Sequence, residues 1–111
     1  HMCRLDPWPD AMNRSHEGAS GAVYQTMWGP SEFYATGNLK DWDRSDRLGE
    51  IDVPVLITCG RYDEATPEAS DWYRGLLPRA ELEVFEHSAH MAHLEEPERF
   101  AGRIRRFLAL H

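Results

Sequence analysis

The sequence predicts an α/β fold for its second half, and three observations lead to this prediction. Residues Val53–Gly60, "VPVLITCG", form a continuous apolar run rich in β-branched residues, as in a strand covered on both faces of a parallel sheet. Residues Glu81–His87, "ELEVFEH", alternate in the manner of a second strand. Apolar residues at helical spacing fall between the two runs, so the strands are expected to be parallel neighbours joined by a right-handed crossover.

The helices of this half have recognisable ends. Thr66 and Pro67 supply an N-cap and a first-turn proline for an amphipathic helix over residues 67–77. Pro97 opens a final helix over residues 97–110, with acids toward its N-terminal end and bases toward its C-terminal end, as the helix dipole favours. Three arginines of this helix are predicted to form a solvated face: Arg103, Arg105 and Arg106.

Residues 1–50 are patterned more weakly and predict a mainly helical segment with loops. The stretch "RLDPWPD", residues 4–10, contains two prolines and predicts an extended, packed loop. A helix is expected from about Asn13 to Met27, and a short helical turn near Ser45–Leu48. The chain is therefore divided into residues 1–50 and an α/β unit of residues 51–111.

Composition and charge narrow the classes of function. The 111 residues carry a formal net charge of −7 without a basic patch, so a nucleic-acid partner is not expected. No apolar stretch approaches the roughly 20 residues that span a bilayer, so no membrane partner is expected either. The N-terminus lacks the order of a secretory signal, and the two cysteines, Cys3 and Cys59, do not suggest a disulfide framework. A cytoplasmic protein is expected.

An acid and a histidine follow the two predicted strands. Asp63 lies just past Gly60, and His90 lies just past His87. Because ligands of open parallel sheets bind at the carboxyl ends of the strands, the two side chains are expected to meet at one sheet edge. An Asp that orients a His makes up two thirds of a hydrolytic triad. The alternative is that Asp63 only caps a helix or stabilises a turn.

The same segment invites two other interpretations, and neither is favoured. Three histidines at three-residue spacing, His87, His90 and His93, suggest zinc, but no carboxylate or cysteine completes a familiar ligand spacing. No metal and no cofactor are therefore expected. Ser88 is not expected to act as a nucleophile, because it does not lie on a strand-to-helix elbow.

Several blocks of the chain resemble known enzymes. The strings "LGEIDVPVLITCGRYDEATP" and "FEHSAHMAHLEEPERF" look like the C-terminal part of an α/β-hydrolase sheet. Four blocks in order, "CRLDPWP", "MWGPSEF", "TGNLKDWD" and "GRYDEATP", resemble more narrowly the proline iminopeptidase family. That resemblance implies a serine aminopeptidase that releases N-terminal proline from peptides with a free N-terminus.

The resemblance also implies roles for four residues. Asp63 matches the acid and His90 the base of the catalytic triad, while Glu64 and Glu32 match the carboxylates that hold the substrate's α-amino group. Two carboxylates suit an ammonium group because opposite charges and acceptor-only oxygens meet a three-donor cation. Residues 1–50 then correspond to a remnant of the cap domain, with Glu32 over the site. The alternatives are a solvated loop acid for Glu64 and a first-turn acid after Pro30 for Glu32.

One departure from the family pattern is large, because the nucleophile elbow G-x-S-x-G is absent. The nearest string, "GASGA" at Gly18–Ala22, has its second glycine one residue too early. The chain is thus interpreted as a cap remnant plus the C-terminal third of a hydrolase, inactive alone, with the missing N-terminal portion or a second copy as partner. Two alternatives stay open: another α/β-hydrolase (esterase, amidase or epoxide hydrolase) or a non-catalytic truncated module.

Overall fold

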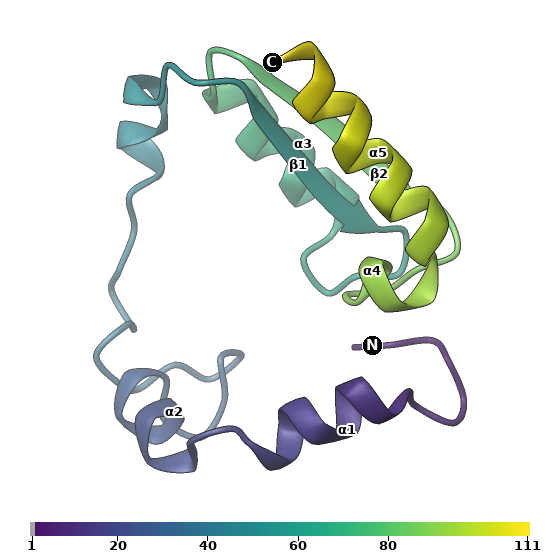
Figure 1. Ribbon diagram of the computed structural model, residues 1–111. Coiled ribbons are helices and arrows are strands. Elements are labelled where there is room, and N and C mark those ends of the chain that lie inside the picture. The colour runs from purple at the N-terminus through teal and green to yellow at the C-terminus, as the bar shows by residue number, and fades with distance from the viewer. Residues whose placement is uncertain (1) are drawn as a thin grey trace. The chain divides into compact units, whose positions relative to one another are not determined.

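The computed structural model describes residues 2–111, which form two compact units (Figure 1). One unit is Asp10–Arg44. The other joins the described N-terminal residues up to Pro9 to Ser45–His111. The second unit therefore includes residues on both sides of the division drawn from the sequence at residue 50.

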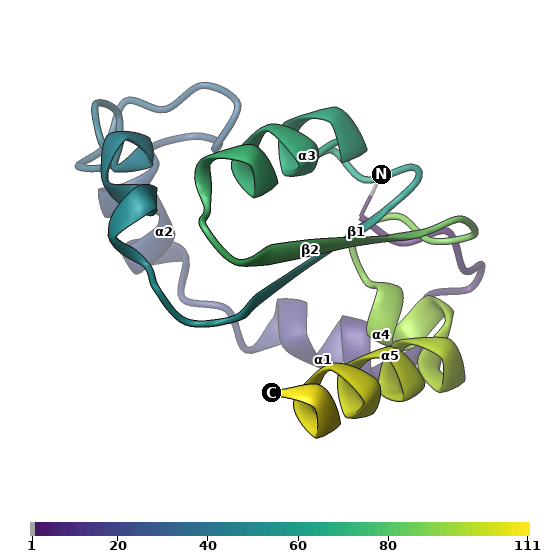
Figure 2. The same ribbon diagram turned by 90° about the horizontal axis from the view of Figure 1, so that it is seen from above.

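The larger unit contains a parallel two-stranded sheet with helices on both faces. Strand β1, Val55–Gly60, pairs with β2, Ala80–Phe85, in parallel, from Val55 opposite Ala80 to Gly60 opposite Phe85. Figure 2 shows α3, Pro67–Leu76, on one face of the strands and α5, Pro97–Leu110, on the other. The predicted strand–helix–strand–helix order is confirmed.

Local sequence signals account for the observed ends of these elements. β1 begins two residues later than predicted, directly after Pro54, which has no N–H to donate to the ladder. The Thr66 hydroxyl accepts a hydrogen bond from the Ala69 N–H at 3.2 Å, which caps α3 as predicted. A 3₁₀ helix, η1, covers Ser45–Glu50, where the sequence predicted a helical turn.

Arg103 of α5 contradicts the prediction of a wholly solvated arginine face. Its side chain is buried, and its guanidinium lies 3.2 Å from Glu83 and 3.6 Å from Glu81 of β2. Alternate residues of β2 face α5, and two of them are acids, so the helix supplies a cation to the strand. Arg105 and Arg106 are exposed, as predicted.

Buried side chains of the larger unit gather around the ends of the strands. Phe85 is fully buried and packs on Phe100 of α5, with their ring centroids 5.6 Å apart. Cys59 is buried too, and burial raises the pKa of its thiol, which therefore remains protonated and unreactive. Cys59 is thus a small residue of the core.

The smaller unit holds two helices where the sequence predicted one. Helix α1 is Asp10–Glu17 and helix α2 is Gly21–Met27. The break falls at residues 18–20, where Ser20 caps α2 by accepting the Val23 N–H at 3.4 Å. Beyond α2, Gly29 has a positive φ of 92°, a conformation that glycine adopts without steric cost.

Candidate active site

Asp63 is held at the carboxyl end of β1 by its own backbone. Its N–H donates to the Gly60 carbonyl at 3.2 Å, and its Oδ1 accepts the Ala65 N–H at 3.0 Å. The Asp63 side chain is only 6% exposed. Asp63 therefore does stabilise a turn, as one sequence alternative had it, and Oδ1 can still accept a second hydrogen bond.

His90 supplies that further bond. Its Nδ1 lies 2.9 Å from Asp63 Oδ1, so the loops after β1 and β2 bring the two side chains together as the parallel order predicted. The carboxylate oxygen can only accept, so in the neutral ring the proton is assigned to Nδ1 and the lone pair to Nε2. The ring is 43% exposed, and no partner for Nε2 is found within residues 2–111. An oriented imidazole with an available Nε2 can act as a general base.

Gly60 allows the histidine loop to approach the end of β1. A Cβ at this position would overlap the carbonyl oxygens of Ser88 and Ala89. The Tyr62 N–H donates to the same Ser88 carbonyl at 3.1 Å. The loop that carries His90 thus lies directly against the backbone that leads to Asp63, and only glycine leaves the space for it.

Two adjacent acids, which sequence reasoning assigned only to the helix dipole, hold the histidine loop. Helix α4, Ala92–Glu95, is a single turn before α5, and it directs the Glu95 and Glu96 carboxylates back to the loop. One oxygen of Glu95 accepts the Ala89 N–H at 2.9 Å and the Met91 N–H at 3.1 Å, so it binds the residues on both sides of His90. A pair of acids five and six residues after the histidine, directly before Pro97, is the signal that could have revealed them.

Glu96 holds the start of the same loop. One of its oxygens accepts the His87 N–H at 3.1 Å and the Ser88 hydroxyl at 2.6 Å. Burial favours the neutral carboxyl, but the hydrogen bonds from Ser88, His87 and Arg99 outweigh burial and lower the pKa of Glu96. The ionised form therefore contributes to the order of the loop.

The two acids predicted to bind an amino group lie in different units. Glu64 is exposed in the loop beside Asp63, at the same end of β1. Glu32 is exposed in Asp10–Arg44, within a turn closed by an isolated bridge between Ser31 and Tyr34. The structure therefore brings Glu64 into the loop of the Asp63–His90 pair, while Glu32 belongs to the other unit. The alternative of a first-turn helical acid after Pro30 is wrong for Glu32.

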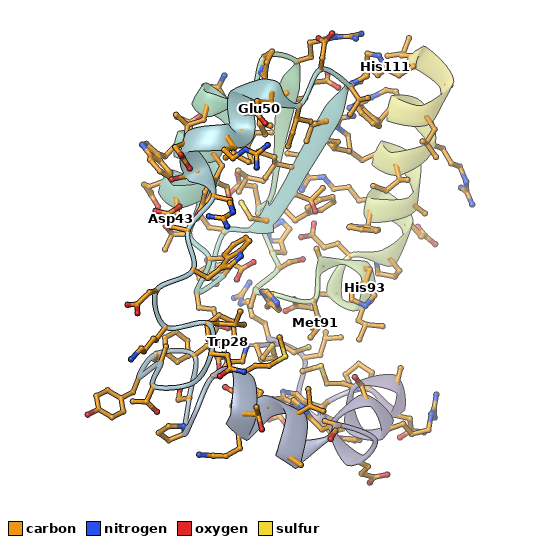
Figure 3. The ribbon with its side chains drawn as sticks, turned by 90° about the vertical axis from the view of Figure 1, so that its left-hand side faces the viewer. Trp28, Asp43, Glu50, Met91, His93 and His111 are labelled. Carbon is orange, nitrogen blue, oxygen red and sulfur yellow. The ribbon has the colours of Figure 1, made fainter. Side chains whose placement is uncertain are left out.

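The remaining candidates of the sequence have structural roles. Within residues 2–111, no group of histidines, cysteines or acids could hold a metal ion. His93 lies on α4, and its ring centroid is 6.0 Å from that of Phe100 (Figure 3). Ser88 is fully buried and donates to Glu96. Ser20 of "GASGA" caps α2, and no strand leads into it, so this string does not form a nucleophile elbow.

The helices of the described chain, residues 2–111, include none with the length and apolar character needed to cross a membrane.

Comparison with known proteins defines the class. The sequence model of the α/β-hydrolase fold family matches residues 11–97, and the chain belongs to this family. It is similar to the proline iminopeptidase of Heyndrickxia coagulans, with 47% identity over 106 residues, which cover 95% of this chain and 37% of that protein.

Solved structures agree with the curated relatives. The proline iminopeptidase of Mycobacterium smegmatis matches with a TM-score of 0.87 and 39% identity, and VinJ matches with a TM-score of 0.88 and 41% identity. Each match covers all of this chain and 38% of the solved one. The chain thus spans somewhat more than a third of the length of the proteins that it resembles.

Proposed function

We propose that this chain forms part of a serine aminopeptidase that releases N-terminal proline from peptides. The observation that carries the proposal is the 2.9 Å contact between His90 Nδ1 and Asp63 Oδ1 at the carboxyl ends of two parallel strands. The similarity to proline iminopeptidases supports the reaction and the substrate class. The serine nucleophile is proposed to come from a part of the enzyme outside these residues.

In this proposal His90 transfers the proton, and Asp63 orients the His90 ring. His90 Nε2 takes the proton of the serine hydroxyl as the oxygen attacks the carbonyl of the first residue, and it then gives that proton to the departing amine. Water then attacks the acyl-enzyme in the same way, with His90 again as the base, and this step releases the first residue and restores the serine. The carboxylate of Asp63 holds Nδ1–H and stabilises the imidazolium that forms transiently.

Glu64 and Glu32 are proposed to bind the substrate's free ammonium group. Glu64 leaves the same loop as Asp63, its side chain is exposed, and it makes no hydrogen bond or ion pair within the described residues. Glu32 would be presented by residues 10–44 acting as part of a cap. A substrate whose N-terminus is blocked would lose this charge pairing, so the two acids would restrict the enzyme to the first residue of a peptide.

The open edge of the sheet supports a partner that carries the nucleophile. The Val55 and Arg61 N–H groups donate toward β2, to Arg79 and Phe85 at 2.9 Å each. Alternation along a strand directs the N–H groups of Leu56 and Thr58 away from β2, and no described strand pairs with that edge. We propose that the N-terminal portion of the hydrolase pairs there, with a second copy of this chain as the competing occupant.

We also place the enzyme in the cytoplasm. The two cysteines, Cys3 and Cys59, are both free and buried, which suits a reducing compartment.

The test is to assay a proline arylamide with residues 1–111 alone, with the intact enzyme, and with the two portions mixed. The chain alone is expected to be inactive, because no described serine lies on an elbow and hydrolysis needs a nucleophile near 3 Å from His90. Turnover by the chain alone would show that residues 1–111 contain the nucleophile, contrary to this proposal. Light scattering distinguishes a second copy from the N-terminal portion as the partner.

A second candidate is a different α/β-hydrolase, because the Asp63–His90 pair suits esters and amides equally well. A simple acyl ester assayed in parallel separates the two candidates. Faster turnover of the ester than of the arylamide, with no requirement for a free amino group, would favour an esterase. Inactivity of the intact enzyme on both substrates would favour a non-catalytic module.

A further inference from the structure

We propose that the N-terminal segment Met2–Arg4 holds the Asp63 and His90 loops together, and that Arg4 is a positioning residue for this pair. The segment includes the start of the "CRLDPWP" block, which has no role in the function proposed above. The kinetic part of this inference rests on the proposed aminopeptidase activity. The structural part does not.

The segment contacts the histidine loop through three polar groups. The His90 N–H donates to the Met2 carbonyl at 3.0 Å, and Arg4 Nη1 donates to the His87 carbonyl at 3.0 Å. The Arg4 N–H donates to Glu95, whose other oxygen brackets His90. These bonds join residues 83 to 91 positions apart in the chain. The backbone of His90 is therefore held directly by the segment and indirectly through Glu95.

Arg4 reaches the acid loop as well. Its guanidinium lies over the Tyr62 ring, 3.9 Å from the ring centroid, and Tyr62 immediately precedes Asp63. A guanidinium can stack on an aromatic face and donate in its own plane at once. Arg4 thus stacks on the acid loop and donates to the histidine loop. The buried side chain of Cys3 anchors the segment between Met2 and Arg4.

The direct bonds between the two loops are few. Besides the Asp63–His90 contact, the Tyr62 N–H donates to Ser88, and the Arg61 side chain pairs with Glu86 on the surface. A displacement of about 1 Å in a catalytic group can lower a rate by about a hundredfold. A residue that bridges both loops therefore controls how well Asp63 orients His90, without touching a substrate.

The first experiment compares Arg4→Met, which removes the donors and the charge, with the matched control Arg105→Met. Arg105 is exposed on α5 and makes no polar contact within the described residues. In the intact enzyme, NMR measures exchange of the His90 Nδ1 proton with water, and a proline arylamide gives kcat and KM. Arg4→Met should speed the exchange at least tenfold and lower kcat about ten- to a hundredfold, with KM within about twofold.

A double-mutant cycle with Tyr62→Leu tests whether Arg4 acts as a bridge. If Arg4 links the loops through the Tyr62 ring, the double variant should lose little more kcat than the more impaired single variant. Losses that multiply would show independent roles and would overturn the bridge. If Arg4→Met fails to fold, Arg4→Lys replaces it, because lysine keeps the charge but cannot stack and donate in one plane. Exchange at least threefold faster than in the wild type is then expected.

The two readouts separate this inference from the proposed function. Exchange of the Nδ1 proton needs no substrate, so faster exchange in Arg4→Met supports the inference even in an enzyme that lacks aminopeptidase activity. Exchange in Arg4→Met equal to that in Arg105→Met overturns it, whatever the enzyme hydrolyses. A lower melting temperature with unchanged exchange and kcat also overturns it, because Arg4 would then contribute only to stability.

Discussion

Three acids of the larger unit are held by hydrogen bonds, whereas Glu32 of the smaller unit is exposed. In the larger unit Asp63 is almost buried and accepts two hydrogen bonds, and Glu95 and Glu96 are each held by several donors. In Asp10–Arg44, Glu32 is exposed, and neighbouring aromatics are exposed too, Phe33 to 73% and Trp42 to 66%.

This difference indicates which tasks need a rigid site. The proton transfer proposed for His90 requires close positioning of its ring, and its loop is held by hydrogen bonds from several elements. Recognition of a substrate's ammonium group needs charge at the right end of a pocket, which an exposed acid on a turn can supply. The larger unit holds its histidine loop with its own elements. The exposed aromatics of the smaller unit, by contrast, are typical of a surface that meets a ligand or another part of a protein.

The largest expected effect comes from Asp63→Asn in the intact enzyme. An amide cannot hold the His90 tautomer as a carboxylate does, so kcat for a proline arylamide should fall by about 10⁴. Asp71→Asn is the control, because Asp71 only pairs with Arg74 on the surface of α3. A loss of less than tenfold in Asp63→Asn would contradict the proposal that Asp63 and the larger unit carry the catalytic step.

Gly60→Ala should have the next largest effect. The new Cβ would overlap two backbone carbonyls of the histidine loop, so the loop has to move, and kcat should fall at least a hundredfold with a lower melting temperature. Gly75→Ala is the matched control, because nothing lies within 4 Å of its Cβ position in α3. There the change should stabilise the protein by about 0.5–1 kcal/mol. Equal melting temperatures for the two variants would contradict the close approach.

Glu64→Ala and Glu32→Ala should act selectively on substrates with a free N-terminus. Removing one partner of a charge pair that becomes buried when the substrate binds costs about 2–5 kcal/mol, so kcat/KM for these substrates should fall more than tenfold relative to N-blocked or ester substrates. The comparison between the two variants tests whether the exposed unit recognises substrate at all. Equal losses on both substrate types would indicate a general structural role instead.

Glu96→Gln should have the smallest effect, on stability and its dependence on pH. The pKa of Glu96 is lowered below its usual value of 4.5, so the ionised form stabilises the fold above that pH, and this contribution is lost as pH falls through the lowered pKa. Near neutral pH the variant should be less stable by about 1.5–3 kcal/mol. Denaturant unfolding at several pH values should show the difference shrinking in acid. A difference independent of pH would show that the charge of Glu96 contributes nothing.

Much of the larger unit could be predicted from local patterns. The runs at Val53–Gly60 and Glu81–His87, and the caps at Thr66 and Pro67, report periodicity and end chemistry, which depend on neighbouring residues only. Parallel neighbouring strands place their carboxyl ends at one edge, so the contact between Asp63 and His90 could be predicted from the element order. The weak helical pattern up to Met27 failed because Ser20 offered a better cap than helix continuation.

The sequence by itself therefore determined the two strands and the two long helices of the larger unit, their order, and the meeting of Asp63 with His90. The tertiary structure alone decided which distant groups hold that pair. Arg4 bonds to His87 and Glu95, and Arg103 is buried against Glu83, through loop paths and side-chain directions that no periodicity encodes. The sequence does not show whether an arginine or a glutamate is surrounded by solvent or is paired with a buried carboxylate or amide. Only the folded chain, by bringing these partners within about 3 Å, makes the distinction.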